Sequence, residues 1–271
     1  MSQIEILGVI YGLLVGVSLG LTGGGGSIFA VPLLLYGLSV PLNSALGLSL
    51  AAVGLTAGFG AALRLRAGEV ELRAGFIFAV AGMLLAPLGT SLGHLIPPTL
   101  LLSSFALLMA YVGVRMWRGR NATADVEPGR CVTDGGGKFG SGCYLRLGAA
   151  GAAAGLLSGL FGVGGGFIIV PALLFVTGMS IHRAVATSLM VIFLIALSGV
   201  AAHLVHGQQF PMPLSALFLG GGLAGMLLGG KLRSRLSGST LQKVFAIGMW
   251  IVAAYMLIRN LPSLSANQTN P

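Results

Sequence analysis

The stretch Ser18-Leu-Gly-Leu-Thr-Gly-Gly-Gly-Gly-Ser27, followed by Val31-Pro32, decides the fold, and the chain contains it twice. The second copy is Leu157-Ser-Gly-Leu-Phe-Gly-Val-Gly-Gly-Gly166, followed by Val170-Pro171, so the two prolines have an offset of 171 − 32 = 139. Each glycine costs a helix roughly 1 kcal/mol relative to alanine, so each copy predicts a break in an apolar helix. Polar backbone at membrane depth is tolerated only under protein or beside water, which makes each break a candidate binding site.

The composition is typical of a polytopic membrane protein. Hydrophobic residues make up 55% of the chain and charged residues 8%, whereas soluble domains carry about 25% charged residues. Apolar runs of bilayer-spanning length recur from end to end. The first ten residues lack a basic n-region and a small-residue cleavage site, so we expect no cleaved signal peptide. The net charge of +9 lies mostly in loops between apolar runs, which indicates membrane orientation and not nucleic-acid binding.

The second half of the chain repeats the first. Gly12, Gly16 and Gly20 recur at the same offset of 139 as Gly151, Gly155 and Gly159. Further on the best match has an offset of 143, where residues 82–85 and 225–228 share the sequence Gly-Met-Leu-Leu. An internal duplication explains these matches. The predicted units are a first transmembrane repeat (1–117), a cytoplasmic linker (118–144), a second transmembrane repeat (145–261) and a flexible tail (262–271). The predicted spans are 45–63, 74–92, 99–117, 184–204, 213–230 and 240–258.

The positive charges indicate how the two repeats are oriented. If each broken segment crosses the bilayer once, the 15 lysines and arginines divide ten to five between the two sides; if each is a hairpin, they divide fourteen to one. Cationic loops stay in the cytoplasm, so the hairpin arrangement is favoured. Three further spans then invert one repeat relative to the other. The sequence predicts an all-α, polytopic helical membrane protein of two inverted repeats, each a glycine-broken helical hairpin plus three transmembrane helices. A parallel bundle with glycine kinks is the alternative.

The linker holds both cysteines, Cys131 and Cys143. Two thiols do not complete a zinc site, and cytoplasmic thiols are kept reduced, so we expect no disulfide.

The breaks offer uncharged donors to a ligand. No charged residue lies in the middle of a predicted span, although a cation site would need carboxylates there. The N–H groups and dipoles at the starts of short helices favour anions. The predicted substrate-binding residues are Thr22, Gly24, Gly25, Gly26, Ser27, Ser49, Gly164, Gly165, Gly166, Thr187 and Ser188. Close packing alone, and back-bonding of each hydroxyl to its own helix, are the competing interpretations.

Two further residues lie at the ends of the helix that carries Thr187 and Ser188. Arg183 and His203 are predicted to serve gating or access of the anion, Arg183 from the cytoplasm and His203 near the outer surface. A snorkelling arginine and an interfacial histidine are the plainer interpretations.

The motifs Gly162-Val-Gly-Gly-Gly166, Val170-Pro171 and Arg183-Ala-Val-Ala-Thr-Ser-Leu189 resemble the TauE/SafE sulfite exporter family, whose members are 4-toluene sulfonate uptake permease-like. The duplicated pattern covers nearly the whole chain except the linker. The resemblance implies a multi-pass transporter in a bacterial or archaeal inner membrane that exports small sulfur-containing anions such as sulfite or organosulfonates. The first repeat departs from the pattern, because Asn43-Ser-Ala-Leu-Gly-Leu-Ser-Leu50 lacks the Thr-Ser pair. We therefore expect a lopsided site.

Other classes of function are less consistent with the sequence. His203-Leu-Val-His206 lacks the glutamate of a zinc-protease motif, so we expect no enzyme. An anion channel, or a transporter of another small organic anion, stays open. The expected partners are a small anionic substrate and the lipid bilayer, with no nucleic acid, no metal and no cofactor; a homodimer also stays open.

Overall fold

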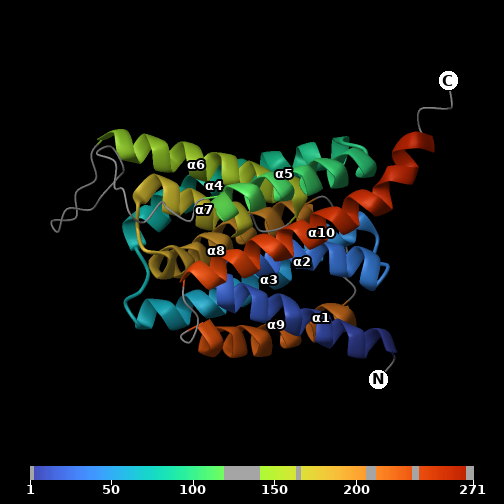
Figure 1. The fold of residues 1–271 in the computed structure, drawn as a ribbon, viewed down its shortest axis with the longest axis horizontal. Helices are drawn as coiled ribbons and strands as arrows, with labels where there is room; N and C mark the ends of the chain where they lie inside the picture. The colour runs from blue at the N-terminus through green and yellow to red at the C-terminus, as the bar shows by residue number, and fades with distance from the viewer. Residues whose placement is uncertain (1–2, 119–140, 163–165, 206–211, 234–237, 267–271) are drawn as a thin grey trace.

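The computed structural model describes residues 3–118, 141–162, 166–205, 212–233 and 238–266, which form a bundle of helices (Figure 1). The helices of the first half are α1 (Gln3–Thr22), α2 (Gly25–Pro32), the π-helical turn η1 (Leu33–Gly37), α3 (Leu42–Arg66), α4 (Leu72–Leu95) and α5 (Pro98–Arg118). Those of the second half are α6 (Ser141–Phe161), α7 (Gly166–Thr177), α8 (Ile181–Val205), α9 (Met212–Arg233) and α10 (Gly238–Ala266). These ranges contain no strand, so the predicted all-α class is confirmed.

Six helices in the described ranges are long and apolar enough to cross a membrane. Four are predicted spans (α3, α4, α8 and α9), and the other two are α1 and α6, the first arms of the broken segments. Helix α1 has 20 residues, about 30 Å at 1.5 Å per residue, because the glycines come late in the apolar run. The predicted spans of α5 and α10 also form helices.

The first break reverses the chain. Gly23 has φ +74°, and Gly162 after α6 has φ +61°, a left-handed conformation that glycine adopts without steric cost. A methyl group added at Gly26 would meet Leu19, and one at Gly37 would meet Tyr11, so α2 and η1 run back along α1. The predicted hairpin therefore forms in the first half. Gly164 and Gly165 of the second break lie outside the described residues.

The turn after each hairpin also uses a left-handed residue. Ser39 (φ +53°) precedes α3, and Gly178 (φ +69°) precedes α8, at an offset of 178 − 39 = 139. The left-handed glycines of the two breaks, Gly23 and Gly162, have the same offset. The left-handed positions therefore follow the spacing of the sequence repeat.

A helix of each half packs against a helix of the other half through glycines. A methyl group on Gly16 of α1 would overlap the carbonyl of Gly222 in α9, and one on Gly155 of α6 would overlap the carbonyl of Gly82 in α4. Gly16 and Gly155 are equivalent in the repeat, so their partners Gly222 and Gly82 are equivalent too, at an offset of 140. The alignment of these helices at an offset of 143 was therefore wrong. We call these contacts the α1–α9 seam and the α6–α4 seam.

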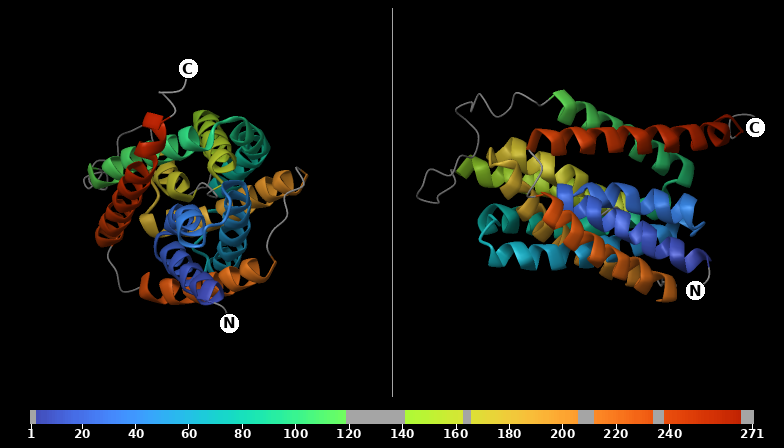
Figure 2. Two further views of the ribbon diagram at one scale, coloured as in Figure 1. Left: turned by 90° about the vertical axis from the view of Figure 1, so that its right-hand side faces the viewer. Right: turned by 60° about the horizontal axis from the view of Figure 1, so that its bottom comes forward.

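The remaining helices are arranged around these seams. Helices α3 and α8 pack on each other in the middle, where Gly60 lies against Leu189 and Gly199 against Leu50. Helices α5 and α10 cross at one edge of the bundle (Figure 2, right). Large apolar side chains face outward on many helices, for example Leu84, Leu107 and Ile251, which are 72%, 61% and 64% exposed. Such an apolar exterior suits a lipid environment.

The helix ends gather at two ends of the molecule. Helix α1 begins and α10 ends at one end, whereas α6 begins at the other (Figures 1 and 2). We call the end where α6 begins the linker end. Most of the predicted linker lies outside the described residues, while α10 continues to Ala266, into the segment predicted to be a tail.

The prediction about the cysteines was wrong for Cys143. Its sulfur is disulfide-bonded, although a reducing cytoplasm would keep a thiol free.

Candidate functional site

The two breaks touch through their backbones. A methyl group added at Gly24 would overlap the carbonyl of Gly166, and one at Gly166 would lie 2.7 Å from the Cα of Gly24. Gly24, Gly25, Gly26 and Gly166 are all buried. The predicted site residues of the two halves therefore meet, and they meet in a closed contact.

A serine from each half holds the turn of the other half. Ser188 Oγ lies 3.0 Å from Gly23 O and 2.9 Å from Val185 O, and its proton can be donated to either carbonyl. Ser49 Oγ donates to Gly162 O at 2.7 Å. Each of the two serines therefore donates to the break of the opposite half. Both are fully buried, so each hydrogen bond is shielded from water. We call the two contacts the serine brackets.

The hydroxyls of the first break satisfy local backbone groups. Thr22 Oγ1 donates to Ser18 O at 2.8 Å and accepts from the N–H of Gly25 at 2.7 Å. Ser27 Oγ donates to Gly24 O at 2.6 Å. The N–H of Gly25, one of the groups predicted to meet an anion, is therefore capped by Thr22 in this conformation.

Thr187 and Arg183 fix the loop between α3 and α4. The fully buried Thr187 accepts a hydrogen bond from the N–H of Glu71 at 2.9 Å. Arg183 lies 3.8 Å from the Glu71 carboxylate, and its side chain is 59% exposed. Ser188 thus reaches a break, whereas its neighbour Thr187 and Arg183 contact the linker-end loop.

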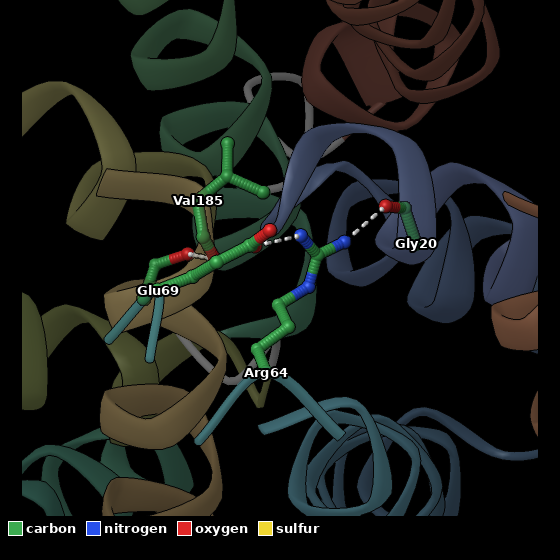
Figure 3. Close-up of polar contacts among 5 residues, drawn as sticks. Gly20, Arg64, Glu69 and Val185 are labelled. Carbon is green, nitrogen blue, oxygen red and sulfur yellow. Dashed lines mark hydrogen bonds and ion pairs between the residues drawn. The ribbon is translucent and has the colours of Figure 1, made fainter. Parts of the chain in front are cut away.

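Arg64 belongs to this region, although the sequence placed it in a loop. It lies in the last turn of α3, its side chain is only 11% exposed, and it donates to Gly20 O at 3.1 Å and to Glu69 at 3.2 Å. Figure 3 shows the guanidinium between these two acceptors. The sequence could have indicated Arg64 as a site residue, because it occupies the repeat position equivalent to the predicted residue His203 (203 − 64 = 139).

His203 lies in the last turn of α8, is 1% exposed, and its ring centroid is 5.8 Å from that of His94 at the end of α4. Helix α8 begins near the linker end and runs away from it, so Arg183 and His203 lie at its opposite ends.

A groove of about 400 Å³ lies away from the breaks, near the linker end. Its lining comes from α4, α6 and α8 and is mostly apolar: Leu72, Arg73, Phe76, Ile77, Tyr144 and Met190. The sequences Gly16-Val-Ser-Leu-Gly20 and Gly89-Thr-Ser-Leu-Gly93 match the nucleophile motif Gly-x-Ser-x-Gly, but both lie inside helices. A nucleophile elbow needs a turn between a strand and a helix, so neither serine has that geometry.

Known proteins match almost the full length of the chain. It is 39% identical over 259 residues to a "Probable membrane transporter protein" of Xylella fastidiosa (strain 9a5c), which covers 94% of this chain and 95% of that protein. A "Probable membrane transporter protein" of Haemophilus influenzae is 30% identical over 278 residues, covering 94% and 98%. The "Probable membrane transporter protein YdhB" of Bacillus subtilis is 30% identical over 201 residues, covering 72% and 76%. No solved structure matches the chain.

These relatives are bacterial, and the six apolar helices agree with their names, so the chain is a multi-pass membrane protein. The sequence model described as "Sulfite exporter TauE/SafE" matches residues 8–256. The chain therefore belongs to the TauE/SafE sulfite exporter family, whose members are membrane transporters and not enzymes.

Proposed function

We propose that this transporter is a secondary carrier that exports a small sulfur-containing anion, such as sulfite or an organosulfonate, and binds it between the two breaks. The observation that carries the proposal is the contact of Gly24 with Gly166, flanked by the serine brackets. Two helix starts and several hydroxyls converge there, and such groups favour anions.

We further propose that the two halves are inverted repeats with the linker end in the cytoplasm. Reciprocal contacts support this: Ser49 with Gly162 and Ser188 with Gly23 are the same contact with the halves exchanged. The two glycine seams are exchanged in the same way. Inverted repeats with broken helices are a common architecture of secondary transporters.

The proposed transport step exchanges internal hydrogen bonds for bonds to the substrate. In the closed conformation Thr22, Ser27, Ser49 and Ser188 donate to backbone carbonyls. When the halves separate, Ser49 and Ser188 lose their acceptors in the opposite half, Gly162 O and Gly23 O, and their hydroxyls become available to the oxygens of an anion. These hydroxyls then replace the hydrogen-bond donors that hydration water supplied to the substrate, and the halves close behind it on the opposite side.

A carrier is favoured over a channel by the closed contact at Gly24 and Gly166, because an open pore would need a continuous wet path. Counterflow in proteoliposomes separates the two classes. A carrier takes up labelled sulfite faster when the vesicles contain unlabelled sulfite, whereas a pore shows no such acceleration.

Thermal stability of the purified full chain tests the binding site. The titrated ligands are sulfite, sulfate, thiosulfate, sulfoacetate and taurine, because a bound ligand raises the melting temperature with its concentration. Ser188→Ala or Ser49→Ala should raise the Kd at least about tenfold, since a hydrogen bond to a charged group contributes roughly 1.5–3 kcal/mol.

Ser104→Ala is the matched control, because Ser104 of α5 donates to Leu101 O of its own helix at 2.9 Å. It should bind like wild type. Unchanged affinity in both the Ser188 and Ser49 variants would show that the substrate does not bind between the breaks. No stabilisation by any of the five compounds would contradict the proposed substrate class.

A further inference from the structure

Arg64 is a cation held largely out of water inside a membrane-spanning helix. Its side chain is 11% exposed, against 46% for its partner Glu69. A charge at such a position is costly unless it is paired, and it is usually functional. Its carbonyl acceptor, Gly20 O, lies near the end of α1, just before the first break.

The partner carboxylate is brought to Arg64 by a local turn. Gly68 has φ +70°, its N–H donates to Leu65 O, and the N–H of Glu69 donates to Arg64 O at 3.2 Å. This Schellman-type turn ends α3 and folds Glu69 back over the helix. The next part of the loop is held separately, because Glu71 bonds to Thr187 and pairs with Arg183. Glu69 can therefore leave Arg64 by rotating its side chain while the loop stays in place.

The pair lies beside the first serine bracket. Gly20, which accepts from Arg64, lies three residues before Gly23, and the carbonyl of Val185 is also an acceptor for Ser188. A methyl group added at Gly23 would lie 2.7 Å from Val185 and 2.8 Å from Ser188 Oγ. Arg64, Val185, Ser188 and Gly23 therefore form one cluster on the linker-end side of the first break.

The ion pair with Glu69 uses only part of the hydrogen-bonding capacity of the Arg64 guanidinium. One nitrogen of Arg64 meets one oxygen of Glu69 at 3.2 Å, whereas an oxyanion with several oxygens can accept from a guanidinium bidentately. The half-exposed position of Glu69 also weakens its attraction to Arg64 through solvent screening. An arriving sulfite or sulfonate group can thus form stronger hydrogen bonds with Arg64 than the carboxylate does.

We propose that Arg64 is the anion-recognising side chain of the first break, and that Glu69 occupies the place of the substrate's anionic group until the substrate displaces it. The inference rests on the proposed function and adds a charged, specificity-determining residue to it. The charge of Arg64 selects anions over neutral compounds, and Glu69 keeps the cation paired when no substrate is bound.

Ligand titrations of the purified full chain with sulfite test the inference through Glu69→Gln and Arg64→Gln. Glu69→Gln removes the competing carboxylate charge and should lower the Kd about two- to fivefold, in line with the strength of a partly exposed ion pair. Arg64→Gln should raise the Kd at least about tenfold. Arg66→Gln is the matched control, because Arg66 is exposed in the same turn of α3 and should bind within about twofold of wild type.

The outcomes separate this inference from the proposed function. A wild-type protein that no sulfur oxyanion stabilises overturns both. Wild-type binding with an unchanged Kd in Arg64→Gln overturns the role of Arg64 alone. If Arg64 only clamps the end of α3, Glu69→Gln lowers the melting temperature without tightening sulfite binding, and that result also overturns the inference. Glu69→Gln keeps the arginine in place, so it tests the inference even if Arg64→Gln does not fold.

Discussion

Ser39 has a backbone conformation that side chains disfavour. Its φ of +53° is left-handed, and at the equivalent position 178 the chain has a glycine with φ +69°. A left-handed residue with a Cβ costs about 1–2 kcal/mol. Replacing Ser39 by glycine removes this strain, although the freer unfolded chain offsets part of the gain.

We expect Ser39→Gly to raise the free energy of unfolding by about 1 kcal/mol and Gly178→Ser to lower it by a similar amount. Thermal unfolding of the purified protein in detergent measures both. Shifts of the same sign in the two variants would contradict the strain argument.

At the level of residues, the sequence was informative about the breaks and less so about side-chain partners. Thr22, Ser27, Ser49 and Ser188 were singled out as hydroxyls near glycines, and all four lie there. Their acceptors could not be predicted, because Ser49 and Gly162 are 113 residues apart and no local pattern relates them. Arg64 was placed outside α3 because hydropathy ends a span at its first charge, whereas the helix continues to Arg66.

Small residues allow particular pairs of helices in this protein to pack closely. In the α6–α4 seam, Gly155 lies against the backbone of Gly82, while a methyl group added at Gly148 of the same helix would meet nothing within 4 Å. Small residues let membrane helices approach closely, and a Cβ in such a contact forces them apart.

We expect Gly155→Ala to destabilise the protein by about 1–3 kcal/mol through overpacking. Gly148→Ala is the control in the same helix and should be neutral or stabilising by up to about 1 kcal/mol, because alanine favours helix. Melting temperatures of the two variants give the comparison. Equal stability of Gly155→Ala and wild type would mean that the seam is not tightly packed.

The existence of the helices was predictable and their pairing was not. Apolar length and glycine clusters are local signals, and they located α3, α4, α5, α8, α9 and α10. A glycine every four residues indicates that a helix has a close neighbour, but it does not identify that neighbour. The correct alignment of α4 with its repeat equivalent α9, an offset of 140, came only from the packing of Gly82 against Gly155 and of Gly222 against Gly16.

The orientation of the whole molecule in the membrane is a prediction. Counting positive charges puts the linker end in the cytoplasm, whereas the disulfide at Cys143 is a feature of oxidising compartments. Both observations concern the same end of the molecule, so direct labelling decides between them.

In a chain with Cys131→Ser and Cys143→Ser, we expect a cysteine at position 95 to react with a membrane-impermeant maleimide in intact cells. Leu95→Cys lies at the end of α4 and replaces a side chain that is 80% exposed. A cysteine at position 142 should react only after permeabilisation; Gly142→Cys lies at the start of α6, in open space. The reverse pattern, with position 142 reactive in intact cells and position 95 protected, would place the linker end outside the cytoplasm.

The exchange of glycine seams between the halves has a consequence for biosynthesis. Helix α4 meets α6 soon after it is made, but α1 ends at Thr22 and its partner α9 begins only at Met212, most of the chain later. At ribosomal speeds of about 5–20 residues per second, α1 waits on the order of tens of seconds for α9. Throughout that interval its glycine face is in contact with lipid or the insertion machinery. Helix α1 is therefore completed long before the partner of its glycine face exists.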